Sequence, residues 1–313
     1  MSQRWLQAPE AVVMIRPHHF RPNAQTAKDN AFQSEAVEGE AQVSQRAYDE
    51  ITDAVAVLRQ HGVCVHLFED QGSDTPDSVF PNNWFSTHGG GHVALHAMYA
   101  KNRRKERRHD VIDFLKMRFR VQDVIDYSGL EQDGLFLEGT GAMTIDHLER
   151  VVYAARSNRT SEVLLERFCT HFNYEPMVFD AITIDGAPIY HTNVLMCIAS
   201  DFALIGADMI PDRARRAEVV DRLATGGRDV IALTPDQIGH FAGNAIELQG
   251  QGGRLLAMSE RAVDALTPDQ RDRIEKHVTL VPLRMPTIEL AGGSVRCTIA
   301  GIHLSPRPEE VAA

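Results

Sequence analysis

The stretch RAYDEITDAVAVLRQHGVCVHLF, residues 46–68, contains the pattern that decides the fold class. In its first part the apolar side chains Ile51, Val55 and Leu58 recur at the spacing of one face of an α-helix. Residues 63–68 then form a short apolar run, rich in β-branched side chains, that is typical of a strand. The stretch therefore predicts a helix that leads directly into a strand.

The same order of helix and strand recurs along the whole chain. The predicted pairs are residues 46–59 with 63–68, 104–119 with 121–127, 161–172 with 177–182, 211–224 with 230–233, and 267–277 with 279–283. Three further pairs of apolar runs resemble hairpins: 135–145 with 151–155, 189–197 with 202–205, and 245–248 with 255–258. Five loose modules of strands plus one helix predict an α/β fold with an internal repeat.

Composition limits the kind of partner that the protein binds. The 313 residues carry a formal net charge of −11 and have a pI near 5.7, so the chain repels phosphate backbones. We therefore expect a small-molecule substrate and neither nucleic acid nor membrane as partner. No linker rich in Pro, Gly or Ser divides the chain, which predicts a single domain over residues 1–313 with a flexible tail from about residue 306.

The chain also shows no sign of export. It has no run of 18 apolar residues and no apolar run behind a basic N-terminus, so we expect neither a membrane span nor a signal peptide, and a cytoplasmic location. Its four cysteines, Cys64, Cys169, Cys197 and Cys297, lack CxxC spacing. This spacing favours reduced thiols over disulfides or a zinc site.

Cys297 is the first candidate for chemistry. It follows the glycine-rich stretch AGGSVR, residues 291–296, and begins a short apolar strand beside Arg296. A basic neighbour favours the thiolate, which is the nucleophilic form of cysteine. The alternative is a small buried hydrophobic residue, which is the common role of a lone cysteine in a strand.

His191 and Glu138 are the next candidates. His191 in IYHTNVLM, residues 189–196, is predicted at the start of a strand, where an imidazole can face a cleft and move protons. Glu138 in LFLEGTGAM, residues 135–143, is predicted at the end of a strand, where a carboxylate can orient an imidazolium. Because the chain has 14 histidines, the position of His191 alone is weak evidence for catalysis. A plain turn would also explain the glycines that follow Glu138.

Asn82, Asn83 and Trp84 form a third candidate group, in the stretch DSVFPNNWF of residues 77–85. Neighbouring amides and an aromatic ring can bind a planar polar group by hydrogen bonds and stacking. The alternative is a turn, because Pro-Asn-Asn is also turn chemistry.

The order of these elements resembles that of the guanidino-group-modifying enzymes, the pentein superfamily of arginine deiminases, dimethylargininases and amidinotransferases. The stretches MIRPHHFRPN, residues 14–23, and TAKDNAFQ, residues 26–33, resemble the branch of dimethylargininase-like and citrulline-utilisation hydrolases. The resemblance implies that Cys297 is the nucleophile, that His191 transfers protons and that Glu138 orients His191.

The resemblance also implies the fold and the remaining site residues. It implies a fivefold pseudosymmetric α/β propeller with the site on its axis, and no metal or cofactor. Arg103 in RRKE and Arg159 in SNRT resemble arginines that hold the substrate or close the site in dimethylargininases, and residues 18–21 resemble a lid loop.

One departure from the family pattern bears on the substrate. Asn82 and Asn83 stand where deiminases and dimethylargininases have acidic residues that pair with a guanidinium. Because a neutral ureido group needs only amide hydrogen bonds, the substitution favours citrulline, which would give ornithine, ammonia and carbon dioxide. Three alternatives stay open: an arginine or methylarginine deiminase or dihydrolase, an amidinotransferase, and an inactive pentein that only binds a ligand. A homo-oligomer also stays open.

Overall fold

The computed structural model describes residues 7–308, whose strands form five separate three-stranded sheets. Each sheet joins an antiparallel pair of strands to one parallel strand. In chain order the sheets are β3 (Phe85–His88), β4 (His92–Leu95) and β5 (Asp123–Asp126); β6 (Thr144–Asp146), β7 (Val151–Ala155) and β8 (Glu175–Phe179); β9 (Met196–Ile198), β10 (Phe202–Ile205) and β11 (Asp229–Ala232); β12 (Ile246–Gly250), β13 (Gly253–Ser259) and β14 (Thr279–Leu283); and β15 (Ala300–Ile302), β1 (Ala11–Pro17) and β2 (Cys64–Asp70). This is the predicted α/β propeller of five modules.

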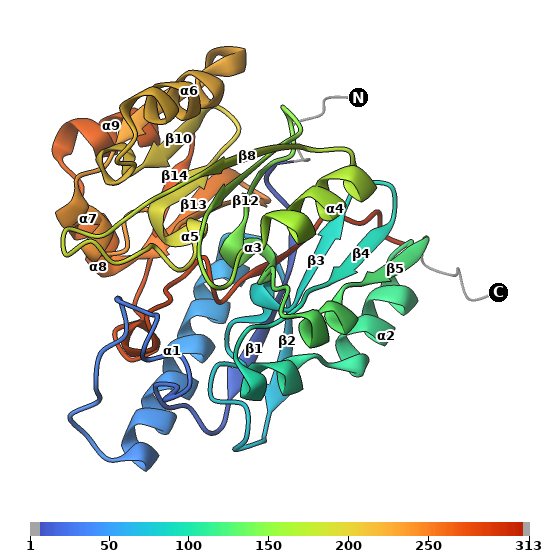
Figure 1. Ribbon diagram of the computed structural model, residues 1–313. Helices are drawn as coiled ribbons and strands as arrows, with labels where there is room; N and C mark the ends of the chain where they lie inside the picture. The colour runs from blue at the N-terminus through green and yellow to red at the C-terminus, as the bar shows by residue number, and fades with distance from the viewer. Residues whose placement is uncertain (1–6, 309–313) are drawn as a thin grey trace.

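The helices that cross between parallel strands lie around the outside of the strands (Figure 1). These helices are α1 (Glu40–Gln60), α2 (His109–Arg118), α4 (Glu162–Phe172), α6 (Arg213–Leu223), α8 (Glu260–Ala265) and α9 (Pro268–Glu275). Shorter helical segments are α3 (Gly139–Ala142), α5 (Thr192–Leu195), α7 (Pro235–Gly239) and the 3-10 turns η2 (Pro81–Asn83), η3 (Lys101–Glu106), η4 (Ser128–Asp133), η5 (Ala207–Met209), η6 (Thr225–Gly227) and η7 (Ile288–Ala291). No helix among the described residues is long and apolar enough to cross a membrane.

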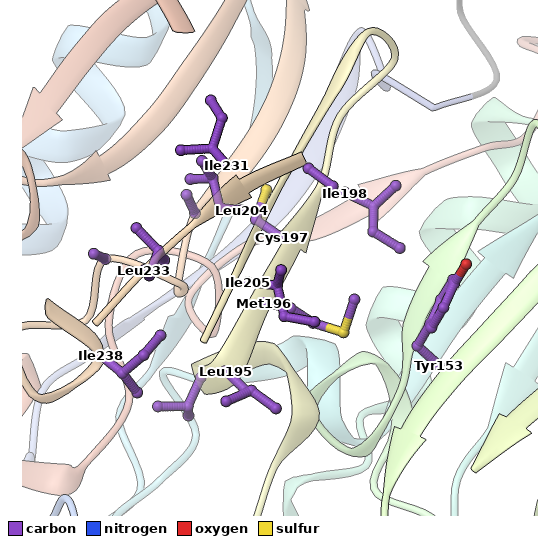
Figure 2. Close-up of a cluster of buried hydrophobic side chains, with 14 of the residues drawn as sticks. Tyr153, Leu195, Met196, Cys197, Ile198, Leu204, Ile205, Ile231, Leu233 and Ile238 are labelled. Carbon is purple, nitrogen blue, oxygen red and sulfur yellow. The ribbon is translucent and has the colours of Figure 1, made fainter. Parts of the chain in front are cut away.

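Residues 46–68 form the predicted helix and strand. Ile51, Val55 and Leu58 are all buried on one face of α1, and β2 pairs in parallel with β1 after the turn at Gly62. The largest hydrophobic cluster lies around β9, β10 and β11, and Figure 2 shows Leu204 and Ile231 of this cluster. Burying one such side chain stabilises the fold by roughly 1.5–3 kcal/mol.

Three predicted elements differ from the structure in type over part of their length, and the helix predicted over residues 46–59 begins earlier, at Glu40. The helix predicted over residues 104–119 is two elements, η3 and α2, because the chain is extended at Arg107 and Arg108. The strands predicted over residues 135–145 and 189–197 are shorter, and each is preceded by a helical turn, α3 or α5. A short apolar run does not distinguish a buried helical turn from a strand, and this is why the sequence pattern failed there.

The ring of modules closes where the two ends of the chain meet. β15 pairs antiparallel with β1, so the last strand and the first strand share one sheet. The segment expected to be a flexible tail is anchored where it begins, because the backbone N–H of Arg307 donates to the carbonyl of Arg118 at 2.9 Å. The expected tail residues 309–313 lie outside the described residues.

Candidate active site

Short turns before the first strand of each sheet gather polar side chains around one centre. Asn83 lies in η2 before β3, Glu138 directly precedes α3 before β6, and His191 directly precedes α5 before β9. Asn244 and Cys297 lie in the turns before β12 and β15. Each of the five modules thus contributes one polar residue, and α3 packs against both η2 and α5.

Most of the predicted site residues line one pocket with a volume of only about 10 Å³. That volume holds about one water molecule, whereas pockets for small ligands usually measure about 300–1,000 Å³. An amino-acid substrate therefore requires a more open state. The pocket is lined by Thr26, Asn30, Asp77, Phe80, Asn83, Arg103, Arg159, Tyr190, His191, Ala291, Gly293 and Cys297.

His191 and Glu138 form a buried pair. His191 Nε2 lies 2.8 Å from Glu138 Oε2, and the two side chains are 2% and 0% exposed. Burial lowers the pKa of His191 to about 4, against the opposing effect of Glu138, so the imidazole is neutral near pH 7. Burial alone would raise the pKa of Glu138, but Arg159, His191 and Arg103 hold that pKa below its usual value. The carboxylate of Glu138 can therefore stabilise the imidazolium that forms when His191 takes up a proton.

The thiol of Cys297 receives two amide hydrogen bonds. Asn193 Nδ2 and Asn244 Nδ2 each lie 3.3 Å from Cys297 Sγ. The Oδ1 atom of Asn244 accepts from the backbone N–H of Arg296 at 3.0 Å, which fixes the amide in place. Two N–H donors stabilise a thiolate more than a thiol, because hydrogen bonds to a charged acceptor are stronger.

The sequence patterns did not identify Asn193 and Asn244 as site residues. A usable signal existed, since both asparagines precede the first strand of a module, as His191 and Glu138 do. Position within the repeat, rather than residue type, marks the side chains that face the axis.

Arg103 is enclosed by acidic groups. Its guanidinium donates to both carboxylate oxygens of Glu106 at 3.0 and 2.9 Å and to Asn83 Oδ1 at 3.0 Å. It also lies 3.4 Å from Asp77 and 3.5 Å from Glu138. Burial alone would lower the pKa of Arg103, but these carboxylates raise it. Arg103 thus lines the pocket with its guanidinium already bound to Glu106 and Asn83 of the protein.

Arg159 lines the pocket and binds a carboxylate of the chain itself. Its Nη2 and Nε atoms donate to the two oxygens of Asp29 at 2.7 and 3.1 Å, and its guanidinium lies 4.7 Å from the ring centre of Tyr190. Nη1 lies 3.5 Å from Glu138. A two-pronged arginine–carboxylate pair is the geometry with which proteins bind amino-acid carboxylates.

Asn82, Asn83 and Trp84, which were predicted as one group, take different positions in the structure. Asn83 lines the pocket, while Asn82 lies beside it, with its Oδ1 accepting from Asn83 Nδ2 at 2.9 Å. Trp84 is fully buried in a hydrophobic cluster with Phe85, 4.5 Å between ring centres, and does not line the pocket. Trp84 directly follows η2 at the start of β3, and this position turns its ring into the apolar layer of its own module.

Residues 18–21, expected as a lid, do not line the pocket of Cys297 and His191 in this structure. They line a separate surface pocket beside α1, where His18 Nε2 lies 2.9 Å from Glu69. Thr26 and Asn30 line the pocket of Cys297 and His191 instead, and Asn30 Nδ2 donates to the carbonyl of Ala291 at 3.0 Å. These lining residues lie just after the expected lid in the chain.

Comparisons with known proteins agree with this architecture. A sequence model of the family described as N,N dimethylarginine dimethylhydrolase, eukaryotic, matches residues 16–304. No curated protein sequence matches the chain significantly. The substrate-bound N-terminal domain of ArgZ, an arginine dihydrolase from the ornithine–ammonia cycle in cyanobacteria, superposes with a TM-score of 0.73 at 17% identity, over 93% of this chain and 97% of that one.

Two further solved structures show the same fold. DDAH from Pseudomonas aeruginosa, in complex with citrulline, superposes with a TM-score of 0.63 at 11% identity, over 94% of this chain and 100% of that one. The apo structure of ArgZ, a longer chain than the N-terminal domain alone, superposes with a TM-score of 0.73 at 18% identity. The match covers 97% of this chain but 42% of that one. The match over residues 16–304, together with the five modules, shows that the chain belongs to the N,N dimethylarginine dimethylhydrolase family of the pentein superfamily and is a hydrolase of C–N bonds other than peptide bonds.

Proposed function

We propose that the protein hydrolyses the terminal C–N bonds of a free arginine-like amino acid, and that its substrate is citrulline, converted to ornithine, ammonia and carbon dioxide. The observation that carries the proposal is the pocket shared by Cys297 and His191, in which the thiol accepts two amide hydrogen bonds and the imidazole is paired with Glu138. This arrangement supports nucleophilic catalysis with proton transfer, and it needs no metal or cofactor.

In the first half-reaction, Cys297 Sγ adds to the ureido carbon of citrulline. His191, which is neutral at rest, takes up the thiol proton and becomes an imidazolium stabilised by Glu138. The amide N–H groups around the sulfur stabilise the charge of the tetrahedral adduct. Collapse of the adduct breaks the bond to the terminal nitrogen, His191 returns its proton, and ammonia leaves an S-linked thiocarbamate of ornithine.

In the second half-reaction, water attacks the thiocarbamate carbon. His191 removes a proton from this water, the C–S bond breaks, and the thiol of Cys297 is restored. The product is the carbamate of ornithine, which decomposes to ornithine and carbon dioxide. The catalytic residues in this scheme are Cys297 and His191, while Glu138 positions His191.

The amides near the sulfur support a neutral reacting group. Asn193 donates to Cys297 through Nδ2, and its Oδ1 atom has no partner among the described residues. A ureido N–H can fill this acceptor without any charge to compensate. Asn83, on the same pocket, adds a third amide.

One observation also fits arginine, the second candidate. Asp77 is 3% exposed, lines the same pocket, and has an Oδ1 atom without a partner among the described residues. Burial raises the pKa of Asp77, and the nearby Arg103 opposes this rise. A cationic group of the ligand is the natural partner for such an oxygen, and that cation is either the guanidinium of arginine or the α-ammonium shared by both amino acids.

The test quantifies ammonia and ornithine released from citrulline and from arginine. Hydrolysis of citrulline yields one ammonia per ornithine, two hydrolytic rounds on arginine yield two, and a deiminase yields citrulline without ornithine. Added glycine as an acceptor would divert the product only in an amidinotransferase. Absence of turnover on both substrates, or unchanged turnover in Cys297→Ser, contradicts the proposal.

Asp77→Asn identifies what Asp77 binds. If Asp77 binds the α-ammonium, kcat/KM falls to the same degree for citrulline and arginine, while 5-ureidopentanoate, which lacks the α-amino group, reacts equally with both proteins. If Asp77 binds the guanidinium, only the arginine reaction falls, and arginine replaces citrulline as the substrate. We also propose that the chain acts as a single catalytic domain in the cytoplasm.

A further inference from the structure

A second pocket lies among the strands, separate from the pocket of Cys297 and His191. Its volume is about 50 Å³, and the two spaces have no lining residue in common. Its wall includes residues from the first strand of all five sheets, β3, β6, β9, β12 and β15, so the space lies where the modules meet. We call it the axial chamber.

The axial chamber has polar walls with unsatisfied atoms. His88 Nδ1 and Thr144 Oγ1 have no hydrogen-bond partner among the described residues, although the two side chains are only 2% and 9% exposed. Both residues line the chamber. Buried polar atoms are nearly always paired, so these two atoms indicate that the chamber holds a hydrogen-bonding occupant.

Four basic side chains line the chamber. Two of them are Arg296 and His88, and the rings of the other two, His147 and His303, lie 4.1 Å apart on its wall. Burial lowers the pKa of His88 and of His147 well below the usual value, so both imidazoles are neutral near pH 7 and each donates from one ring nitrogen. The positive charge at the chamber is that of the Arg296 guanidinium.

The chamber's acidic group is compensated elsewhere. Glu247 is the one carboxylate among the lining residues, and Oε2 accepts from the backbone N–H of Ser200 at 2.8 Å and from its hydroxyl at 2.7 Å. Oε1 accepts from Arg254 Nη1 at 2.9 Å. The carboxylate therefore does not neutralise Arg296, and the chamber favours a negative occupant.

We propose that the axial chamber is a binding site for one small oxyanion of the size of bicarbonate, held by Arg296, His88 and Thr144. The chamber volume admits an anion of a few heavy atoms and excludes an amino acid. A planar oxyanion accepts hydrogen bonds from a guanidinium, an imidazole N–H and a hydroxyl at once.

The site is connected to the nucleophile through one short path. Arg296 precedes Cys297 in the chain, and its backbone N–H donates to Asn244, whose Nδ2 donates to Cys297 Sγ. An anion bound to the guanidinium of Arg296 is thereby linked to Asn244, the residue that positions the thiol. Binding itself does not depend on the proposed function.

The test is calorimetric titration of sodium bicarbonate into the wild-type protein, with gluconate, which is too large for the chamber, as background anion. Thr144→Val removes only a hydroxyl that has no protein partner, so the fold is retained, as thermal unfolding will verify. Tyr153→Phe is the matched control, because Tyr153 pairs with Thr144 across β6 and β7 and its buried hydroxyl also lacks a partner, but it does not line the chamber.

We expect saturable one-to-one binding to the wild type, about fivefold weaker binding to Thr144→Val, as for the loss of one hydrogen bond, and wild-type affinity in Tyr153→Phe. Tighter binding of phosphate with the same dependence on Thr144 would support the oxyanion site and assign phosphate as its occupant. Equal affinity in all three proteins, no saturable binding, or equally tight binding of chloride would overturn the proposal. The titration uses no substrate, so its result is independent of turnover.

Discussion

The shifted pKa of His191 makes the stability of the protein depend on pH. The folded state holds the pKa of this imidazole at about 4 because the ring is buried, while the unfolded chain has the usual value of 6.5. Between these values the unfolded state binds the proton more strongly, so the contribution is fully present above pH 6.5 and is lost as pH falls towards 4. The loss amounts to roughly 3 kcal/mol.

Denaturant unfolding at several pH values checks this expectation. His191→Gln removes the titrating group, so the difference in unfolding free energy between wild type and variant should fall as pH drops from 6.5 to 4. His19→Gln, at an exposed histidine, is the matched control for the loss of an imidazole. A difference that is constant with pH would show that His191 keeps an ordinary pKa.

The short helix α3 contains a glycine, Gly141, whose missing side chain leaves room for Asn83 and His191. A Cβ atom at Gly141 would lie 2.4 Å from Asn83 Nδ2 and 2.8 Å from His191 Nδ1. Gly141→Ala should therefore displace the imidazole and lower kcat by about 10²-fold, since small misplacements of catalytic groups have effects of this size. Gly129→Ala, where a Cβ meets nothing within 4 Å, should keep full activity. Near-normal kcat in Gly141→Ala would show that the site tolerates movement of His191.

The segment of residues 23–33, which lines the pocket with Thr26 and Asn30, is tied to Arg159 by Asp29. We propose that Asp29 here occupies the guanidinium that binds the carboxylate of the substrate. Asp29→Asn should free Arg159, lower KM by roughly fivefold, as for the loss of one partly exposed ion pair, and increase hydrogen exchange in residues 23–33. A higher KM would show instead that Asp29 binds the substrate.

The type of an element was predictable where the pattern was long and failed where it was short. The buried face of α1 follows from Ile51, Val55 and Leu58, which recur at helical spacing over two turns, although the helix begins at Glu40, earlier than the predicted residue 46. The turns α3 and α5 are four residues each, and their conformation follows from tertiary contacts such as the close approach of Gly139 to the carbonyl of Asn82. Such contacts have no local sequence signal.

At the scale of the whole molecule, the repeat explains why a site can form from residues far apart in the chain. Cys297, His191 and Glu138 were expected to meet, and the structure pairs the latter two and places the first two on one pocket. Asp29 and Asp77 were missed as site residues, because their role depends on which arginines the fold brings to them. The sequence order of the modules was predictable, but the closing pair of β15 with β1 was not, since it joins residues nearly 300 positions apart.

The proposed mechanism requires a covalent bond between Cys297 and the substrate. Peptide mass spectrometry after acid quench of the protein with citrulline during turnover, with Cys297→Ser in parallel, detects this bond. We expect a mass gain on the peptide that contains Cys297 equal to the substrate less one ammonia, and no gain in the variant. Turnover at a normal rate with no adduct on this peptide, or an adduct on Cys64, Cys169 or Cys197 instead, would contradict it.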